Sequence, residues 1–114
     1  MRKNTFILPR DIKMDKKSRL IKELKFFKVK NNIDAIYLFG SRASGKVNKW
    51  SDVDLIIVSK RFKGKGLLDR APALYMKWNL KYPVDMLCYT PGEFKKFNKQ
   101  VSIVSEAVKN GIRI

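Results

Sequence analysis

Histidine is missing from this chain of 114 residues, and cysteine occurs once, at Cys88. The absence of histidine excludes imidazole-based acid–base chemistry and histidine-ligated zinc. A single cysteine cannot form a disulfide within the chain. Because Cys88 lies in an apolar run, we expect a buried thiol in a reducing compartment.

Long apolar runs are also missing. No stretch approaches the roughly 18 residues of a membrane span, and Phe6-Ile7-Leu8, stopped by Pro9, is too short for the core of a signal peptide. We therefore expect a soluble, cytoplasmic protein with no membrane partner.

Acidic residues are scarce, with 10 against 26 lysines and arginines, and the formal net charge is +16. This excess should attract nucleic acid, nucleotide phosphates or an acidic protein. A merely solvated, lysine-rich surface explains the same composition. A contact with RNA through the basic surface therefore stays open, and the few carboxylates become the informative residues.

The length is that of one domain, residues 1–114, in which we expect residues 1–13 to form a loosely held arm. Hydrophobic periodicity and turn residues predict an α/β (α+β) class, with a small mixed sheet of three or four strands and flanking helices. The predicted elements are a helix over 14–30, strands over 33–39 and 52–59, a helix over 70–80, a strand over 84–89, a helix started by Thr90-Pro91 and completed as a capping box by Glu93, a helix carrying Val101, Val104, Ala107 and Val108, and an edge strand over 112–114.

The connections predict the topology. The link between the first two strands is too short for a crossover helix, so they should be antiparallel. The second and third strands are separated by a helix of crossover length and should be parallel. The end of the first strand and the starts of the other two would then meet at one end of the sheet, where Gly40-Ser41, Asp52, Asp54 and Asp85 lie.

Three aspartates at that end suggest a metal site. Asp52 and Asp54 are two positions apart on a strand, so both side chains leave one face, roughly 7 Å apart. Asp85 begins the neighbouring strand and could complete the cluster. Carboxylates alone suit Mg²⁺ or Mn²⁺ held together with substrate phosphates, and two ions about 4 Å apart would fit.

The Gly40-Ser41 turn could supply a phosphate-binding backbone, with Arg42 as a nearby positive charge that could equally pair with an aspartate. Each feature alone has an ordinary structural explanation: a simple turn, an aspartate capping the turn after Ser51, or an aspartate paired with a lysine. Their joint occurrence at one sheet end carries the prediction.

A basic loop and several aromatic residues are further candidates for contacts with a ligand or a partner. The basic loop Lys60–Gly66 follows the second strand and should lie roughly 20 Å from the aspartates, which favours a solvated or partner-binding loop. Trp50 precedes Ser51 and is a candidate to touch a nucleobase. We expect Tyr75, Trp78 and Tyr82 to pack in the core or against helices.

The combination of Gly40-Ser41-Arg42 with Ser51-Asp52-Val53-Asp54-Leu55, followed by Tyr82-Pro83-Val84-Asp85, resembles the polymerase-beta-like nucleotidyltransferase superfamily. The resemblance covers about residues 15–114 and is greatest to its minimal, single-domain prokaryotic members. It implies that Asp52, Asp54 and Asp85 are catalytic and bind the metal ions, and that Gly40, Ser41 and Arg42 bind the nucleotide. A nucleoside monophosphate, AMP from ATP, would pass to a hydroxyl acceptor.

Larger members of the superfamily carry a second domain that positions the acceptor. We expect nothing in these 114 residues to do so, and therefore expect a partner to provide it. Minimal members are typically paired with a small helical HEPN protein, and the resemblance implies an antitoxin that modifies a tyrosine of such a toxin, in a homo- or hetero-oligomer. One alternative is a non-catalytic subunit that binds nucleotide or masks a partner by contact alone. A second alternative is an accessory protein that binds RNA nonspecifically through the +16 charge.

Overall fold

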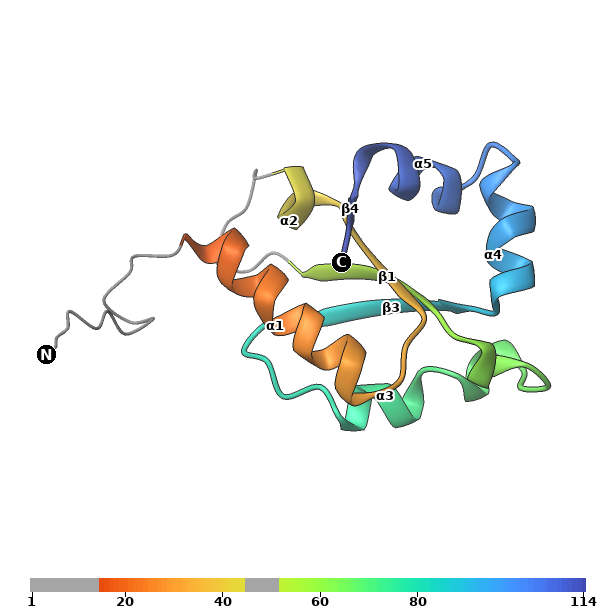
Figure 1. Ribbon diagram of the computed structural model, residues 1–114, viewed down its shortest axis with the longest axis horizontal. Coiled ribbons are helices and arrows are strands. Elements are labelled where there is room, and N and C mark those ends of the chain that lie inside the picture. Colours follow the sequence, from red (N-terminus) through yellow and green to blue (C-terminus); the bar gives the residue numbers. More distant parts are fainter. Residues whose placement is uncertain (1–14, 45–51) are drawn as a thin grey trace, which may run out of the picture.

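The computed structural model describes residues 15–44 and 52–114 and forms a mixed α/β structure around a four-stranded sheet (Figure 1). Its elements, in chain order, are α1 (Lys16–Lys30), β1 (Ala35–Phe39), α2 (Ser41–Ser44), β2 (Val53–Val58), the 3-10 turns η2 (Lys60–Phe62) and η3 (Leu67–Asp69), α3 (Pro72–Met76), β3 (Val84–Tyr89), α4 (Pro91–Asn98), α5 (Ile103–Asn110) and β4 (Ile112–Arg113). The predicted fold class is confirmed. The expected arm, residues 1–13, lies outside the described residues.

The sheet has the strand order β3-β2-β1-β4. β1 pairs antiparallel with β2 and with β4, and β2 pairs parallel with β3. Both predicted strand orientations are therefore confirmed, and β4 forms the predicted edge strand. Within the described part of the chain, no helix is long and apolar enough to cross a membrane.

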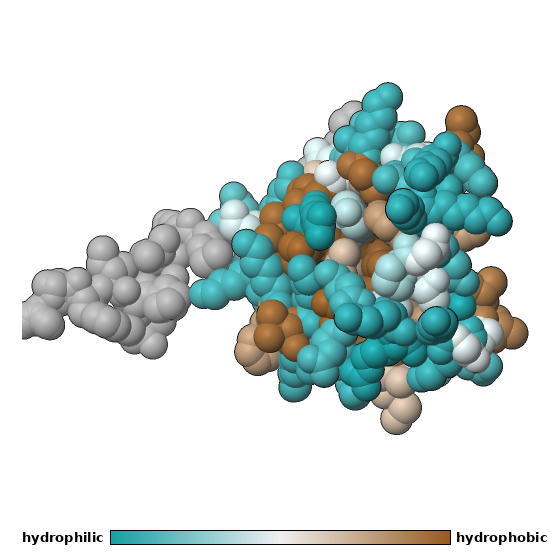
Figure 2. Space-filling view, turned by 45° about the vertical axis from the view of Figure 1, so that its right-hand side comes forward, coloured by the Kyte–Doolittle hydropathy of each residue, from teal (hydrophilic) through white to brown (hydrophobic). Residues whose placement is uncertain are grey.

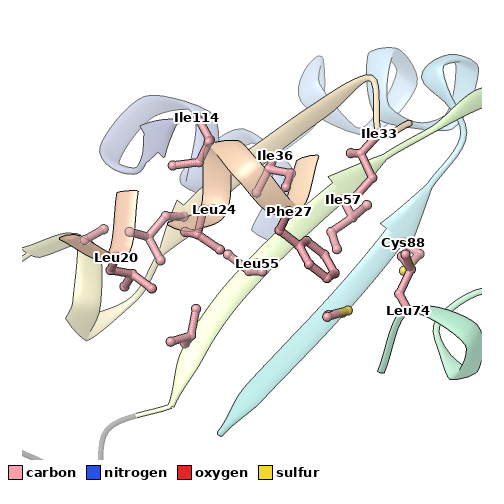
Figure 3. Packing of buried hydrophobic residues seen from close by; sticks show 14 of the residues in the cluster. Leu20, Leu24, Phe27, Ile33, Ile36, Leu55, Ile57, Leu74, Cys88 and Ile114 are labelled. Carbon is pink, nitrogen blue, oxygen red and sulfur yellow. The ribbon is translucent and has the colours of Figure 1, made fainter. Parts of the chain in front are cut away.

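Each face of the sheet has its own core because side chains alternate along the strands. The first core lies beneath α1 and α3, and Leu24, Leu55 and Ile57 are among its buried members (Figure 3). The second core lies beneath α4 and α5 and includes Ile56 and Val104. The four apolar residues 55–58 of β2 are all buried, as expected for a central strand covered on both faces.

The sequence fixes both ends of α1. The Asp15 side chain accepts a hydrogen bond from the Ser18 amide at 2.7 Å and caps the N-terminus. At the other end the Asn31 side chain donates to the Phe27 carbonyl at 2.9 Å, and Asn32 takes a left-handed conformation with φ of 54°. The predicted end at Asn31-Asn32 is confirmed.

The predicted helix over 70–80 was too long, because α3 covers only Pro72–Met76. Arg70 before it and Trp78 after it are engaged in long-range contacts. The Trp78 ring packs edge-on against Phe27 with centroids 5.3 Å apart, and its Nε1 donates to the Tyr82 carbonyl at 2.8 Å. These contacts hold the chain after α3 in a non-helical path that leads back toward β3.

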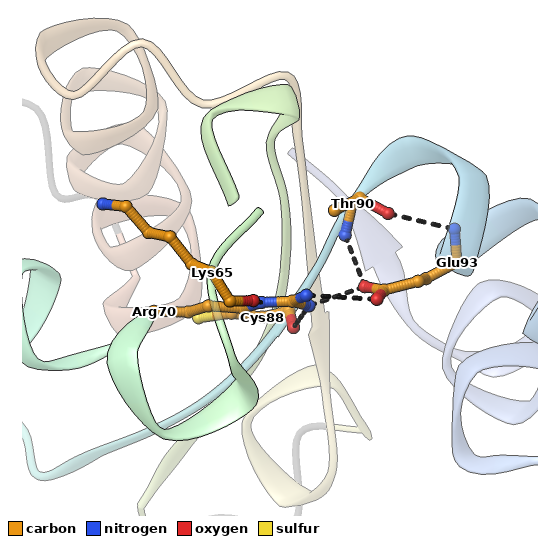
Figure 4. A network of polar contacts seen from close by, with 5 residues as sticks. All are labelled: Lys65, Arg70, Cys88, Thr90 and Glu93. Atoms are coloured by element: carbon orange, nitrogen blue, oxygen red, sulfur yellow. Dashed lines mark hydrogen bonds and ion pairs between the residues drawn. The ribbon is translucent and has the colours of Figure 1, made fainter. Parts of the chain in front are cut away.

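Arg70 connects the outer edge of β3 to α4 (Figure 4). Its guanidinium donates to the Cys88 carbonyl at 3.2 Å and to both carboxylate oxygens of Glu93, at 2.6 and 3.1 Å. The Glu93 carboxylate also accepts a hydrogen bond from the Thr90 backbone amide. In return, the Thr90 hydroxyl accepts a hydrogen bond from the Glu93 backbone amide. The predicted capping box at Thr90 is therefore present, and it holds a buried arginine as well.

Candidate functional site

The end of β1 and the starts of β2 and β3 meet at one end of the sheet. Asp54 lies in register with Phe39 of β1 on one side and with Asp85 of β3 on the other. Asp54 and Asp85 lie two positions before Ile56 and Leu87, which pack beneath α4 and α5. Because residues two apart on a strand share a face, both carboxylates leave that face of the sheet. The structure thus brings these two residues together as the topology predicted.

Asp54 is affected by the charges of the two other aspartates. Asp52 and Asp85 are exposed, and Asp54 is partly buried. Burial raises the pKa of Asp54, and the negative charges of Asp85 and Asp52 raise it further. A cation held between these carboxylates would relieve their repulsion, and their all-oxygen donor set fits a hard divalent ion.

The carboxylates do not already form a closed ligand cage. Among residues 15–44 and 52–114, no group of three or more acidic or cysteine side chains converges closely enough to hold a metal ion. The donor chemistry therefore fits a metal, whereas the side chains of this conformation stand apart. The metal-binding role of Asp52, Asp54 and Asp85 stays a prediction.

Gly40 packs directly against the Asp54 side chain. Its φ of 75° lies in the left-handed region, and a Cβ at this position would collide with the Asp54 carboxylate. The Gly40 carbonyl accepts hydrogen bonds from the amides of Ala43 and Ser44, at 3.1 and 3.2 Å, and so closes the turn into α2. Glycine is thus required here both for the backbone conformation and for the close approach to a carboxylate.

The two residues after Gly40 differ in their surroundings. Ser41 begins α2 and is partly buried. Arg42 is buried, with 7% exposure, and its guanidinium lies over the Tyr82 ring at 4.6 Å from the centroid. Tyr82 precedes β3, so this cation–π contact joins α2 to the segment that carries Asp85. Sequence reasoning treated Tyr82 as a packing residue and missed this contact, because helical periodicity gives no signal for it.

The other predicted positions include some that the structure describes and some that it does not. Trp50 and Ser51 lie outside the described residues. The basic loop Lys60–Gly66 follows the far end of β2, as expected, and begins with a turn that buries Phe62.

The thiol and the remaining aromatic residues behave largely as structural groups. Cys88 is buried, which raises its pKa to about 11, so its thiol is a poor nucleophile. Trp78 packs in the first core. Tyr75 is 39% exposed, and its hydroxyl accepts from the Met86 amide at 2.9 Å.

Figure 2 shows a face of the molecule on which hydrophilic side chains surround several separate hydrophobic patches. Exposed apolar side chains include Phe26 and Val29 on α1, and Leu68 and Met76 around α3. These belong to the elements that cover the sheet face opposite to the aspartates.

Comparison with known proteins supplies independent information. A family described as the nucleotidyltransferase domain matches residues 17–114. A Haemophilus influenzae protein named "Probable protein adenylyltransferase MntA" is 32% identical over 71 residues, which make up 60% of this chain and 62% of that protein. The chain therefore spans about three fifths of the length of this curated relative.

A solved structure agrees with the fold. A crystal structure from Sulfolobus solfataricus, of a protein considered to be a nucleotidyltransferase, superposes with a TM-score of 0.57 at 24% identity. The match covers 85% of this chain and 80% of that one. At this level of identity the likeness concerns the fold alone.

Proposed function

Because this chain belongs to the nucleotidyltransferase domain family, as its motifs predicted, we propose that it transfers AMP from ATP to a hydroxyl group of a partner protein. The observation that carries the proposal is the pairing of Asp54 with Asp85 on one sheet face, against the Gly40 turn. The naming of a similar protein as an adenylyltransferase of proteins supports a protein acceptor.

In the proposed reaction the acceptor oxygen attacks the α-phosphorus of ATP, the bond between the α-phosphorus and the bridging oxygen breaks, and pyrophosphate leaves. Asp52, Asp54 and Asp85 would hold two Mg²⁺ ions, which Mn²⁺ could replace. Such ions would neutralise the negative charge of the phosphates. Asp85, exposed at the edge, accepts the proton of the acceptor hydroxyl at its carboxylate. The Gly40-Ser41 turn orients the triphosphate, and Arg42 holds α2 against Tyr82.

The proposed acceptor is a tyrosine of a small helical HEPN toxin, which makes this chain an antitoxin acting in the cytoplasm within a hetero-oligomer. The support is the resemblance to minimal nucleotidyltransferases, together with a surface charge suited to an acidic or nucleic-acid-bound partner. RNA contact through the basic surface is part of the same proposal.

Label transfer tests the reaction. The protein is purified together with its associated proteins and incubated with Mg²⁺ and ATP labelled at the α-phosphate. We expect label on an associated protein, and a loss of at least about 100-fold in Asp54→Asn, because one carboxylate of the metal-binding set becomes neutral. Chelation of divalent ions should abolish labelling, and Mg²⁺ or Mn²⁺ should restore it.

Asp69→Asn is the matched control, since Asp69 is exposed in η3, outside the candidate site. It should label like the wild type. Equal labelling by the wild type and Asp54→Asn would refute the proposed catalysis. An Asp54→Asn variant that no longer labels the partner but still neutralises it would instead favour masking by contact.

A further inference from the structure

A small pocket lies beside the 3-10 turn η2, at the end of β2 opposite to the aspartates. Its volume is about 70 Å³, roughly twice the share of one water molecule in the liquid. Its polar lining comes from segments far apart in the sequence and includes Asn31, Ser59, Arg61, Lys65, Arg70 and Lys77. We call it the η2 pocket. Its size suits a small ion and is too small for a nucleoside.

Three cationic side chains of the η2 pocket have no acidic partner. Arg61 and Lys65 belong to the basic loop, and Lys77 follows α3. Within the described part of the chain none of the three forms an ion pair, and no acidic side chain lines the pocket. Arg70 is already paired with Glu93, and Lys65 extends away from the Arg70 guanidinium (Figure 4). The pocket therefore carries a positive charge that the protein itself does not balance.

A buried hydroxyl group adds a hydrogen-bond donor. Ser59 is 2% exposed and lines the pocket. Its Oγ accepts from the Arg61 amide at 3.2 Å, but within residues 15–44 and 52–114 its hydroxyl proton meets no acceptor. Leaving a buried donor unpaired costs free energy, and buried polar groups are normally satisfied by protein, water or a ligand. Ser59 thus calls for an acceptor inside the pocket.

The end of α1 does not oppose an anion at this place. Carbonyl groups at a helix C-terminus carry partial negative charge. Here the Asn31 carbonyl accepts from Arg61 Nη1 at 3.3 Å, and the Lys28 carbonyl accepts from the Ile33 amide at 3.0 Å. The Asn31 side chain donates one N–H to the Phe27 carbonyl and has a second N–H. The helix end therefore offers a donor beside compensated carbonyls.

We propose that the η2 pocket binds a phosphate group, through ionic contacts with Arg61, Lys65 and Lys77 and a hydrogen bond from Ser59. The oxygens of a phosphate accept hydrogen bonds in several directions, which suits cationic donors from separate segments. Ser59 lies five positions after Asp54, which along a strand is roughly 16 Å. This phosphate is therefore separate from the nucleotide at the Gly40 turn, and the inference does not depend on the proposed transfer of AMP.

Inorganic phosphate is the probe for this site. In amide NMR spectra of the intact protein, with the ionic strength held constant by NaCl, phosphate should shift the signals of Ser59, Arg61 and Lys65 until they saturate. Lys65→Gln and Lys77→Gln should each weaken binding about tenfold, the effect of one lost hydrogen bond to a charged group. Both side chains are exposed, so these variants should keep the fold.

Ser59→Ala should weaken phosphate binding about fivefold, the effect of one lost hydrogen bond. Because Ser59 is buried, the spectrum of this variant must first show the native fold. The two lysine variants carry the test if it does not. Phenyl phosphate identifies the source of the group: binding as tight as that of inorganic phosphate indicates the end of a larger molecule, whereas binding of inorganic phosphate alone indicates the free ion.

Lys63→Gln is the matched control, because Lys63 is exposed in the same basic loop but does not line the pocket. It should bind phosphate like the wild type. Shifts that never saturate, shifts confined to the Gly40 turn, or equal weakening by Lys63→Gln and Lys65→Gln would overturn the assignment. Label transfer that depends on Asp54 would leave the proposed function intact in those cases.

Discussion

At the scale of single residues, Gly40 combines two requirements that usually occur apart. Its backbone lies at a positive φ, where a side chain is strained, and its missing Cβ leaves room for the Asp54 carboxylate. Gly64 has a similar φ of 83°, but a Cβ there would meet nothing within 4 Å. Substituting each glycine by alanine therefore distinguishes the free-energy cost of backbone strain from that of a steric collision.

We expect Gly64→Ala to destabilise the protein by about 1 kcal/mol through strain alone, with activity retained. Gly40→Ala should cost about 2–3 kcal/mol, because the new methyl group also displaces the Asp54 carboxylate. Its nucleotidyl transfer should fall at least about 100-fold. Urea denaturation and label transfer measure the two quantities. Equal behaviour of the two variants would show that Asp54 is not positioned through Gly40.

The surroundings of Arg42 differ from those that its position in the sequence suggests. Its place directly after Gly40-Ser41 suggested a phosphate ligand or an ion pair with an aspartate. The structure buries it against Tyr82, a residue 40 positions away. A contact of this kind depends on how α2 lies against the segment before β3, which no local pattern encodes.

At the scale of elements, the outer edge of β3 is protected by side chains rather than by a further strand. The Tyr75 hydroxyl accepts from the Met86 amide, and the Arg70 guanidinium donates to the Cys88 carbonyl. Both partners come from the segment between β2 and β3. Unpaired strand edges invite pairing with other chains, so this covering disfavours aggregation.

The ion pair between Arg70 and Glu93 predicts a pH dependence. Hydrogen bonds from Arg70 and from the Thr90 amide lower the pKa of Glu93 from 4.5 to about 2. The charged form is thus favoured by folding, and its stabilisation is complete above about pH 4.5 and is lost as the pH falls through about 2. Glu93→Gln should cost about 1–2 kcal/mol at neutral pH, a value reduced by solvent screening because the Glu93 side chain is 37% exposed.

Denaturant unfolding of the wild type and Glu93→Gln across this pH range measures the difference. The gap should shrink steadily below about pH 4.5. Glu23→Gln is the control, because Glu23 is a partly buried residue of α1 and undergoes the same chemical change. A gap that is independent of pH would contradict the ion pair as its source.

Gly111 joins α5 to β4 at a point of close backbone contact. A Cβ there would collide with the carbonyl oxygens of Ala107 and Leu38. We expect Gly111→Ala to destabilise the protein by about 2–3 kcal/mol, because β4 must move away from β1. Gly92→Ala is the control: it lies in α4 with open space around it, and should be neutral or stabilising by up to about 1 kcal/mol. Thermal denaturation compares the two variants, and equal melting temperatures would contradict the collision.

At the scale of the whole molecule, the formal charge of +16 on 114 residues should destabilise the folded state through self-repulsion. Raising NaCl from about 20 to about 200 mM should raise the melting temperature by several degrees, since the Debye length shortens to less than 10 Å. The variant Lys16→Glu with Lys17→Glu should show a smaller response. Both lysines are exposed in the first turn of α1, which has no acidic residue. A melting temperature that is independent of salt in both proteins would contradict this account.

The local elements follow from the sequence alone, and so does the end of the sheet at which the aspartates lie. Caps such as Thr90, turn residues such as Gly40 and the buried run 55–58 act through neighbouring residues, so their effects can be read from short patterns. Strand direction followed from the lengths of the connections. These features suffice to place Asp54 and Asp85 at the same end of the sheet.

The residues that surround the site are set by tertiary packing and do not follow from local sequence patterns. The shortening of α3, the burial of Arg42 on Tyr82, the fit of Gly40 to Asp54 and the pocket beside η2 all join segments distant in sequence. Such contacts depend on the exact packing of helices on the two faces of the sheet. Hydrophobic periodicity specifies which face of an element is buried, but not which side chain it meets there.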